Sequence, residues 1–296
     1  MHLATEIPPT PKPTPKIIRL FWGHVHKALV KLAFKYAHWR GRKINNQIIH
    51  LPFGLLLKWS DGTRVEEVLT MQVARAAGFP VPRVICYGEH PESPHALISI
   101  IMTRMPGFEL GQVYKSLEPE EKDTIMSEIK LYMDVMRSWT NPWGRDRICS
   151  VSGSAIRSLA VVPHIMGPFE NEQKLNEFLI DGTGNDNGMP ASKFEGKVAT
   201  VKEGLAITLP HRIVFTHGDL MHHNILVHNG HLSAILDWEA AGWLPEYWEF
   251  TTAARIMRPG VWWYDCVKDS LQLGGYPKEF ELAMALIGLT SGAYCW

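Results

Sequence analysis

The sequence predicts an α+β fold in two lobes, and three observations support this prediction. The chain has 296 residues, which is more than one hydrophobic core usually organises. Its first half carries short apolar and β-branched runs that are typical of strands, whereas residues 118–139 have the apolar spacing of a long helix. Apolar residues make up 46% of the chain, and this content is typical of a globular protein.

Composition excludes several classes of protein. Lys and Arg number 30 and so do Asp and Glu, so the chain lacks the positive charge of a typical nucleic-acid-binding protein. Its four cysteines have no metal-binding spacing, prolines stand where a signal peptide would need an apolar segment, and no run of about 18 apolar residues occurs. We therefore expect a cytoplasmic protein with reduced thiols, no nucleic-acid partner and no membrane-inserted segment.

The N-terminal segment is basic. Residues 1–15 are rich in Pro and Thr, which is typical of a disordered or polyproline arm. Residues 16–43 form a separate basic segment, and within it residues 16–40 predict one amphipathic helix. No acidic residue occurs between Ile7 and Ser60. Such a helix usually packs on its own domain, and the alternative is peripheral contact with an anionic membrane surface.

The first lobe begins with two expected strands in residues 44–59. The second strand holds Lys58 inside an apolar run, where a lysine is either an edge residue that reaches solvent or a buried cation with a function. Residues 64–77 then predict a helix with Glu66 and Glu67 in its first turn. These acids either interact with the helix dipole alone, or one of them also pairs with Lys58.

Further elements follow in order. Residues 83–87 and 96–103 predict two more strands of the first lobe. Residues 118–139 predict a helix with one apolar face, which we assign to the core of the second lobe. Residues 181–192 are rich in Gly, Asp and Asn and predict a surface loop.

The most informative stretch is residues 212–248, which carries a hairpin signal. Residues 225–228 and 231–236 are apolar runs joined by Asn229-Gly230. A type I′ turn needs a positive φ at both central positions, so Asn-Gly between apolar runs strongly indicates a hairpin.

A two-residue turn also predicts the register of this hairpin. His228 should face His231, and Asn224 should face Ile235. Asp237 would then lie on the same face as Asn224, on the diagonal, at roughly 7–8 Å. Such a separation leaves room for a cation between a carboxylate and an amide oxygen.

Asp219, Asn224 and Asp237 together form a set that phosphoryl transfer requires. One carboxylate orients the attacking hydroxyl and accepts its proton, while an Asn and a second Asp hold magnesium on the phosphates. Singly, such residues are ordinary turn formers or helix caps. The histidines around Asp219 also suggest a zinc hydrolase, but no matching ligand pair follows elsewhere in the sequence.

The segments THGDLMHHNILV and ILDWE, at residues 216–227 and 235–239, resemble the catalytic and metal loops of the aminoglycoside phosphotransferase and choline kinase-like family, especially its fungal members. The resemblance extends over about residues 44–290 and implies a protein kinase-like fold. In that fold, residues 44–107 would be a small antiparallel-sheet N-lobe that binds nucleotide. Residues 108–296 would be a larger, mainly helical C-lobe that holds the catalytic and acceptor sites.

The resemblance also implies roles for individual residues. Asp219 would be the catalytic base, and Asn224 and Asp237 would be the magnesium ligands. The LPFGLLLKW stretch is similar to a family segment in which the lysine, here Lys58, binds the α- and β-phosphates of ATP. Glu67 would pair with this lysine, as its position in the following helix matches the family better than that of Glu66.

Two further positions would contact the nucleotide: by resemblance, the Thr103 carbonyl and the Met105 amide would bind adenine. The chain reaches Pro245 within a few residues of Asp237, which leaves no room for a peptide-binding activation segment. We therefore expect an ATP- and Mg²⁺-dependent kinase of a small hydroxylated molecule. The alternative is a catalytically silent binder of the same fold, since no glycine-rich phosphate loop precedes Lys58.

Overall fold

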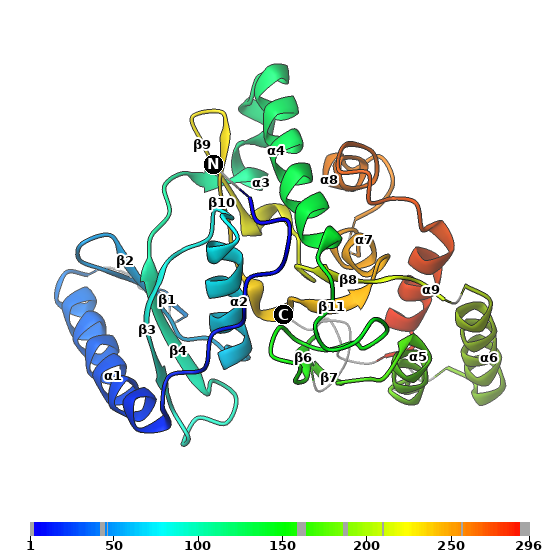
Figure 1. Ribbon diagram of the computed structural model, residues 1–296, viewed down its shortest axis with the longest axis horizontal. Helices are drawn as coiled ribbons and strands as arrows, with labels where there is room; N and C mark the ends of the chain where they lie inside the picture. The colour runs from blue at the N-terminus through cyan, green and yellow to red at the C-terminus, as the bar shows by residue number, and fades with distance from the viewer. Residues whose placement is uncertain are drawn as a thin grey trace.

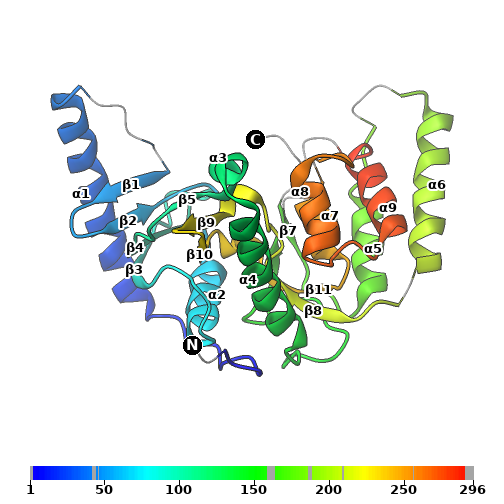
Figure 2. The same ribbon diagram turned by 90° about the horizontal axis from the view of Figure 1, so that it is seen from above.

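The computed structural model describes residues 3–41, 45, 47–158, 164–185, 189–208, 210–255 and 257–290. They form two lobes that lie side by side (Figures 1 and 2). The N-lobe contains helices α1 (Lys16–Trp39) and α2 (Val65–Ala76) and strands β1 (Ile48–Leu51), β2 (Leu55–Lys58), β3 (Val84–Glu89) and β4 (Ile98–Thr103).

These four strands form one antiparallel sheet in the order β1-β2-β4-β3. Alternate residues of a strand point to opposite faces of a sheet, and β4 shows the consequence. Ile101 packs beside residues of α1, whereas Ile100 and Met102 belong to the main core together with residues of α2. The sheet therefore lies between the two helices (Figure 1).

The C-lobe is mainly helical. Its elements are β5 (Phe108–Glu109), α3 (Leu110–Val113), η1 (Tyr114–Ser116), α4 (Pro119–Ser138), β6 (Ile156–Arg157), β7 (Ile165–Met166), α5 (Glu172–Asp181), α6 (Ala191–Thr208), β8 (Ile213–Thr216), η2 (His222–Asn224), β9 (Ile225–His228), β10 (His231–Ile235), η3 (Trp238–Ala240), β11 (Gly242–Pro245), α7 (Trp248–Ala253), α8 (Trp262–Asp265), η4 (Cys266–Ser270) and α9 (Pro277–Ile287). The strands form three small antiparallel sheets: β10-β9-β5, β11-β8 and β6-β7.

One hydrophobic core continues through both lobes. It includes Val68 of α2, Ile100 of β4, Ile129 of α4 and Phe215 of β8. A second core lies in the C-lobe beneath α5, α6 and α9. Because the main core is shared, the ends of β2, β8 and β10 are held in a constant relation to one another, and these strands carry the predicted site residues.

The N-terminal segment packs on both lobes. Residues 3–15, for which the composition predicts a disordered or polyproline arm, run past α2 and α4 and hydrogen-bond to both lobes (Figures 1 and 2). Backbone groups of an extended chain need partners wherever the chain packs on a surface, and the two lobes supply them. These hydrogen bonds are Ala4 N to Ala77 O (3.0 Å), Trp139 Nε1 to Ala4 O (3.1 Å), Thr10 Oγ1 to Val151 O (3.2 Å) and Thr14 N to the Tyr87 hydroxyl (2.6 Å).

Helix α1 ends one residue before its expected end at residue 40, and α2 and α4 also lie where the periodicity predicts them. The expected loop at residues 181–192 separates α5 from α6, and its residues 186–188 lie outside the described part of the chain. No described helix combines the length and the apolar character that crossing a membrane requires.

Candidate active site

Lys58 ends β2 with its ammonium group buried among carboxylates. Its Nζ lies 2.8 Å from Glu67 Oε1 of α2, 2.7 Å from Asp237 Oδ1 and 3.6 Å from Glu239 Oε2. Burial alone would lower the pKa of Lys58, but the negative charges of Asp237, Glu67 and Glu239 outweigh it and raise this pKa well above its usual value. Lys58 is thus a buried cation that links the two lobes, and not an edge residue that reaches solvent.

Glu67, and not Glu66, is the partner of Lys58. Burial raises the pKa of Glu67, although the Lys58 ammonium opposes this effect. Glu66 instead accepts a hydrogen bond from Ser154 Oγ of the C-lobe (2.9 Å). The two neighbouring acids of α2 therefore hold different groups: Glu67 joins α2 to β2, and Glu66 joins α2 to the C-lobe.

The turn at His217-Gly218 is built around a buried carboxylate. Glu249 accepts hydrogen bonds from the His217 amide (2.6 Å) and the Gly218 amide (3.1 Å). Gly218 has φ 77°, and a Cβ atom there would overlap the carbonyl oxygen of Ala240. The His217 ring contacts the Leu236 carbonyl oxygen through Nε2 (2.8 Å). This turn therefore needs glycine and is fastened to the segment that precedes Asp237.

Asp219 follows this turn and is buried between two partners. Its Oδ1 lies 2.9 Å from Arg255 Nη2, just beyond the end of α7. Asn224 Nδ2 donates to both Asp219 Oδ2 and the Asp219 carbonyl oxygen, each at 2.9 Å. The Asp219 carboxylate is therefore held in one orientation by a cation and an amide.

The hairpin forms as predicted, but its register changes along β10. His228 pairs with His231 as expected. Asn224, however, lies opposite Leu236 and not Ile235, since the Leu236 amide donates to the Asn224 carbonyl oxygen (2.8 Å). The cause is a bulge in β10, which adds one residue to that strand and shifts every later pair.

Asp237 therefore does not lie on the strand diagonal from Asn224, as the regular hairpin predicted. Strand β10 ends at Ile235, and Asp237 adopts a left-handed backbone with φ 63°. This conformation directs its carboxylate to Lys58. Burial alone would raise the pKa of Asp237, but the Lys58 ammonium outweighs it and lowers this pKa.

A cleft of 740 Å³ lies between the lobes at this point. Lys58 and Asp237 both line it, and residues 60–64 and Arg157 are among the other lining groups. Asp219 and Asn224 are buried next to each other and are not lining residues of the cleft. The structure thus brings the site residues together as two pairs: Lys58 with Asp237 at the cleft, and Asp219 with Asn224.

Thr103 and Met105 do not line this cleft. Thr103 is the last residue of β4 and pairs with Leu55, and its Oγ1 accepts a hydrogen bond from the Arg83 amide (2.9 Å). Both residues are partly buried. Their contact with adenine remains a prediction.

Sequence reasoning missed two charged residues of the cleft. Arg157 of β6 forms an ion pair with Glu239 (2.7 Å), and its guanidinium group packs against Gly62 of the N-lobe. Burial and the negative charge of Asp237 raise the pKa of Glu239 to about 8. Glu239 stands in the ILDWE motif and could have been found there, whereas Arg157 lies in a loop-rich stretch that carries no signal.

Among the described residues, one group of three acids could hold a metal ion: Glu67, Asp237 and Glu239 offer oxygen atoms within 4.8 Å of one another. No described histidine belongs to such a group. His222 packs instead against the Trp262 ring, with centroids 5.5 Å apart. The arrangement therefore does not support the zinc hydrolase alternative.

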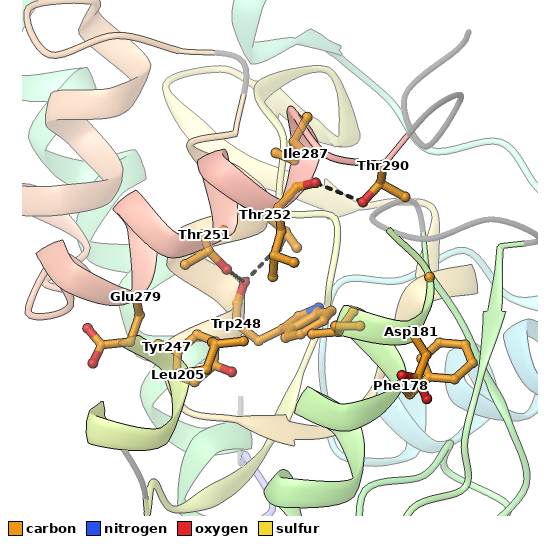
Figure 3. A pocket seen from close by; sticks show the side chains of 14 residues that line it. Phe178, Asp181, Leu205, Tyr247, Trp248, Thr251, Thr252, Glu279, Ile287 and Thr290 are labelled. Carbon is orange, nitrogen blue, oxygen red and sulfur yellow. Dashed lines mark hydrogen bonds between the residues drawn. The ribbon is translucent and has the colours of Figure 1, made fainter. Parts of the chain in front are cut away.

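A separate cavity of 220 Å³ lies between α5, α6, α7 and α9 (Figure 3). Its walls are mainly apolar and include Trp248 and Leu286. Thr252 also lines it, and the Thr252 carbonyl oxygen accepts a hydrogen bond from Arg255, the partner of Asp219 (2.8 Å). The cavity thus adjoins the helix that supports Asp219, and its lining includes two acids, Asp181 and Glu279.

Comparison with known proteins agrees with this geometry. Residues 141–273 match the model of APH, the phosphotransferase enzyme family. No curated protein matches the chain by sequence. Among solved structures, aminoglycoside phosphotransferase APH(4)-Ia is 19% identical, with 82% of this chain and 79% of that chain covered and a TM-score of 0.52.

Two other solved structures are similar at lower identity. The gentamicin complex of APH(2")-IIa is 13% identical, with 84% of this chain and 90% of that chain covered and a TM-score of 0.52. The GDP complex of aminoglycoside 2'-phosphotransferase-IIIa is 12% identical, with 81% and 78% covered and a TM-score of 0.53. These likenesses confirm the predicted α+β, kinase-like fold class. Together with the match over residues 141–273, they confirm the predicted resemblance to the aminoglycoside phosphotransferase family.

Proposed function

We propose that this protein is an ATP- and Mg²⁺-dependent phosphotransferase that moves the γ-phosphoryl group to a hydroxyl of a small molecule. One observation carries the proposal: the buried Lys58 ammonium lies between Glu67 of the N-lobe and Asp237 of the C-lobe, in the cleft that separates the lobes. A ternary complex of an APH(4)-Ia mutant with AMP-PNP and hygromycin B supports the choice of ATP and of a small acceptor.

Lys58 would bind the phosphates of the nucleotide. Its pKa is raised, so the side chain is charged at neutral pH. Glu67 is buried against it and would keep the ammonium in place when phosphate oxygens replace the Asp237 carboxylate as its second partner. Preorganised positive charge of this kind stabilises a phosphoryl group as it is transferred.

Asn224 and Asp237 would hold the magnesium ion. Magnesium prefers oxygen ligands, and both residues offer one: Asn224 forms its two hydrogen bonds through Nδ2, so its Oδ1 is not used by them. The Asp237 carboxylate faces the cleft beside Glu239. The residues present therefore fit the ion, which when bound would neutralise charge on the phosphates.

Asp219 would accept the proton of the acceptor hydroxyl. Burying a carboxylate is costly unless it has an opposite charge and hydrogen-bond donors beside it, and Arg255 and Asn224 supply both. The same two partners orient it, which leaves the position of the acceptor to be set by the surrounding C-lobe. Thr103 and Met105 would contact the adenine base from the end of β4.

An activity screen tests the proposal. Purified protein is incubated with γ-labelled ATP, magnesium and a panel of hydroxylated acceptors that includes aminoglycosides, amino alcohols and sugars. We expect transfer to at least one acceptor, and a fall of roughly 10²- to 10⁴-fold in the Asp219→Asn variant, which is the usual contribution of a general base. Asp134→Asn, an exposed acid of α4, is the matched control.

Calorimetric titration with ATP and magnesium separates the outcomes. Binding that is retained in Asp219→Asn while transfer is lost assigns Asp219 to the chemical step. Binding by the wild type without transfer to any acceptor would favour the catalytically silent alternative. Full transfer activity in Asp219→Asn would remove Asp219 from the proposed role.

A further inference from the structure

Helix α1 packs on the N-lobe through one face only. Gly23 contacts β3 so closely that a Cβ atom there would overlap the Glu89 carbonyl oxygen. His26 is buried, and its Nδ1 lies 2.6 Å from Ser99 Oγ of β4. Arg19 forms an ion pair with Glu89 on the same side (2.8 Å). Contacts with β3 and β4 of the same lobe therefore cover this face of α1.

The opposite face of α1 is apolar and exposed. Ile17 is 77% exposed, Phe21 60%, Leu32 62% and Trp39 75%. At roughly 3.6 residues per turn, these four positions fall within about 60° of one another around the helix axis. They therefore form one outward stripe along almost the whole helix, which we call the outer stripe. An exposed apolar surface of this extent marks an interaction site.

Positive charge accompanies the outer stripe. Lys31 and Lys35 are exposed beside it, and neither forms an ion pair with any described residue. The Arg40 guanidinium lies 5.9 Å from the Trp39 ring. Because no acidic residue occurs between Ile7 and Ser60, nothing along the helix itself neutralises these charges.

The position of α1 leaves the stripe accessible. The helix forms the outer edge of the N-lobe, at the end of the molecule away from α6 and α9 (Figures 1 and 2). Its partners are β3 and β4, on its inner side. The lining residues of the interlobe cleft do not include any residue of α1, so the stripe and the cleft can be occupied at the same time.

We propose that the outer stripe docks the protein on an anionic phospholipid surface. A single apolar helix face with basic residues along its border is the arrangement by which a helix lies in the plane of a membrane interface, with side chains that reach about 5–10 Å into it. Trp39 and Tyr36 stand at one end of the stripe, with their rings 6.0 Å apart, and such rings prefer the interface. The unpaired positive charge selects anionic headgroups over a neutral surface.

Vesicle sedimentation tests this proposal independently of any phosphotransferase activity. Wild-type protein is mixed with vesicles of phosphatidylcholine alone or with about 30% phosphatidylserine, an anionic lipid that attracts basic segments. We expect pelleting with the anionic vesicles, at least 5-fold less on neutral vesicles, and release by high salt, which screens exposed charges.

Two variants at the stripe and one matched control complete the test. Ile17→Asp and Leu32→Asp should each lower the pelleted fraction at least 5-fold. Ile207→Asp on α6 should not, although Ile207 is 77% exposed, as Ile17 is. Equal pelleting of all three variants, or no pelleting of the wild type on anionic vesicles, would overturn the proposal. Light scattering that shows a wild-type dimer abolished by Leu32→Asp would overturn it too, because the stripe would then bind a second copy.

Discussion

Lys58 and Asp237 lie 179 positions apart in the sequence, and a hydrogen bond of 2.7 Å joins their side chains. Lys58 is the last residue of β2 in the N-lobe, and Asp237 directly precedes η3 in the C-lobe. The pair therefore sets the distance between the lobes at the cleft. Its charges depend on each other, since each residue shifts the pKa of the other toward the charged form.

The first prediction concerns this pair. Lys58→Met removes the ammonium that contacts Glu67, Asp237 and Glu239. Removing one partner of a buried ion pair leaves uncompensated charge, so we expect the free energy of unfolding to fall by about 3–5 kcal/mol. Urea denaturation measures it. Lys174→Met, which breaks an exposed pair with Glu177, should change the free energy of unfolding far less, because solvent screens exposed ion pairs. Equal losses in both variants would contradict a stabilising role for the buried Lys58 pair.

The second prediction concerns the turn before Asp219. Gly218→Ala places a methyl group against the Ala240 carbonyl oxygen at a positive φ, so we expect a loss of stability of about 1–3 kcal/mol. Gly196→Ala in α6 is the control, because that position is open and helical. There alanine should stabilise by roughly 0.5–1 kcal/mol. Thermal unfolding of both variants checks the opposite signs.

The third prediction concerns Arg255 as a positioning residue. Arg255→Met leaves the buried Asp219 carboxylate with the Asn224 amide alone. We expect kcat of the proposed transfer to fall by about 10²-fold, because a misplaced base loses its geometry, while KM for ATP stays within about twofold. Arg255→Lys keeps the charge and should recover part of kcat. A variant that loses ATP binding and kcat together would instead show a structural role for Arg255.

The fourth prediction is a pH dependence of stability that originates at α1. Burial and the positive charge of His90 lower the pKa of His26 to about 4, from an ordinary 6.5. The unfolded chain therefore binds the proton first, and the stability contributed by neutral His26 is complete above pH 6.5 and is lost as the pH falls toward 4. By about pH 5 the loss reaches about 2 kcal/mol, at roughly 1.4 kcal/mol per unit.

Urea denaturation at about pH 7.5 and about pH 5 checks this loss, which burial-driven linkage requires. His26→Gln can still hydrogen-bond to Ser99 but does not titrate, so the difference between the two pH values should shrink. His90 also contributes, because burial, Lys27 and His24 lower its pKa to about 4 against the opposing charge of Glu92. An unchanged difference in His26→Gln would exclude His26 as a source.

Local signals in the sequence anticipated much of the fold. The apolar periodicity located α1, α2 and α4, and Asn229-Gly230 located the turn between β9 and β10. These features depend on residues within a few positions of one another, which is why a pattern can predict them. The residues themselves left Glu66 and Glu67 as possible partners of Lys58, and only the resemblance to the kinase-like family favoured Glu67, which is the partner in the structure.

Other features arise only where distant segments meet. The bulge in β10 changes the register so that Asn224 lies opposite Leu236. No residue type in that strand predicts such an insertion. The docking of residues 3–15 depends on hydrogen bonds to both lobes, whereas their composition predicted only a disordered or polyproline arm. Arg255 lies 36 positions beyond its partner Asp219 in a stretch without a motif.

Residue types and short spacings therefore predicted the chemical groups of the site, but they did not predict how these groups are arranged in space. The proposed base Asp219, the Asn224 amide, the Asp237 carboxylate and the early Lys58 can be recognised from residue types and short spacings, because each lies in a turn or strand with its own signal. Which of them touch was settled by the shared core and the left-handed backbone of Asp237. Those contacts depend on long-range packing, in which the lobes bury common apolar surface and their charged groups must find partners there.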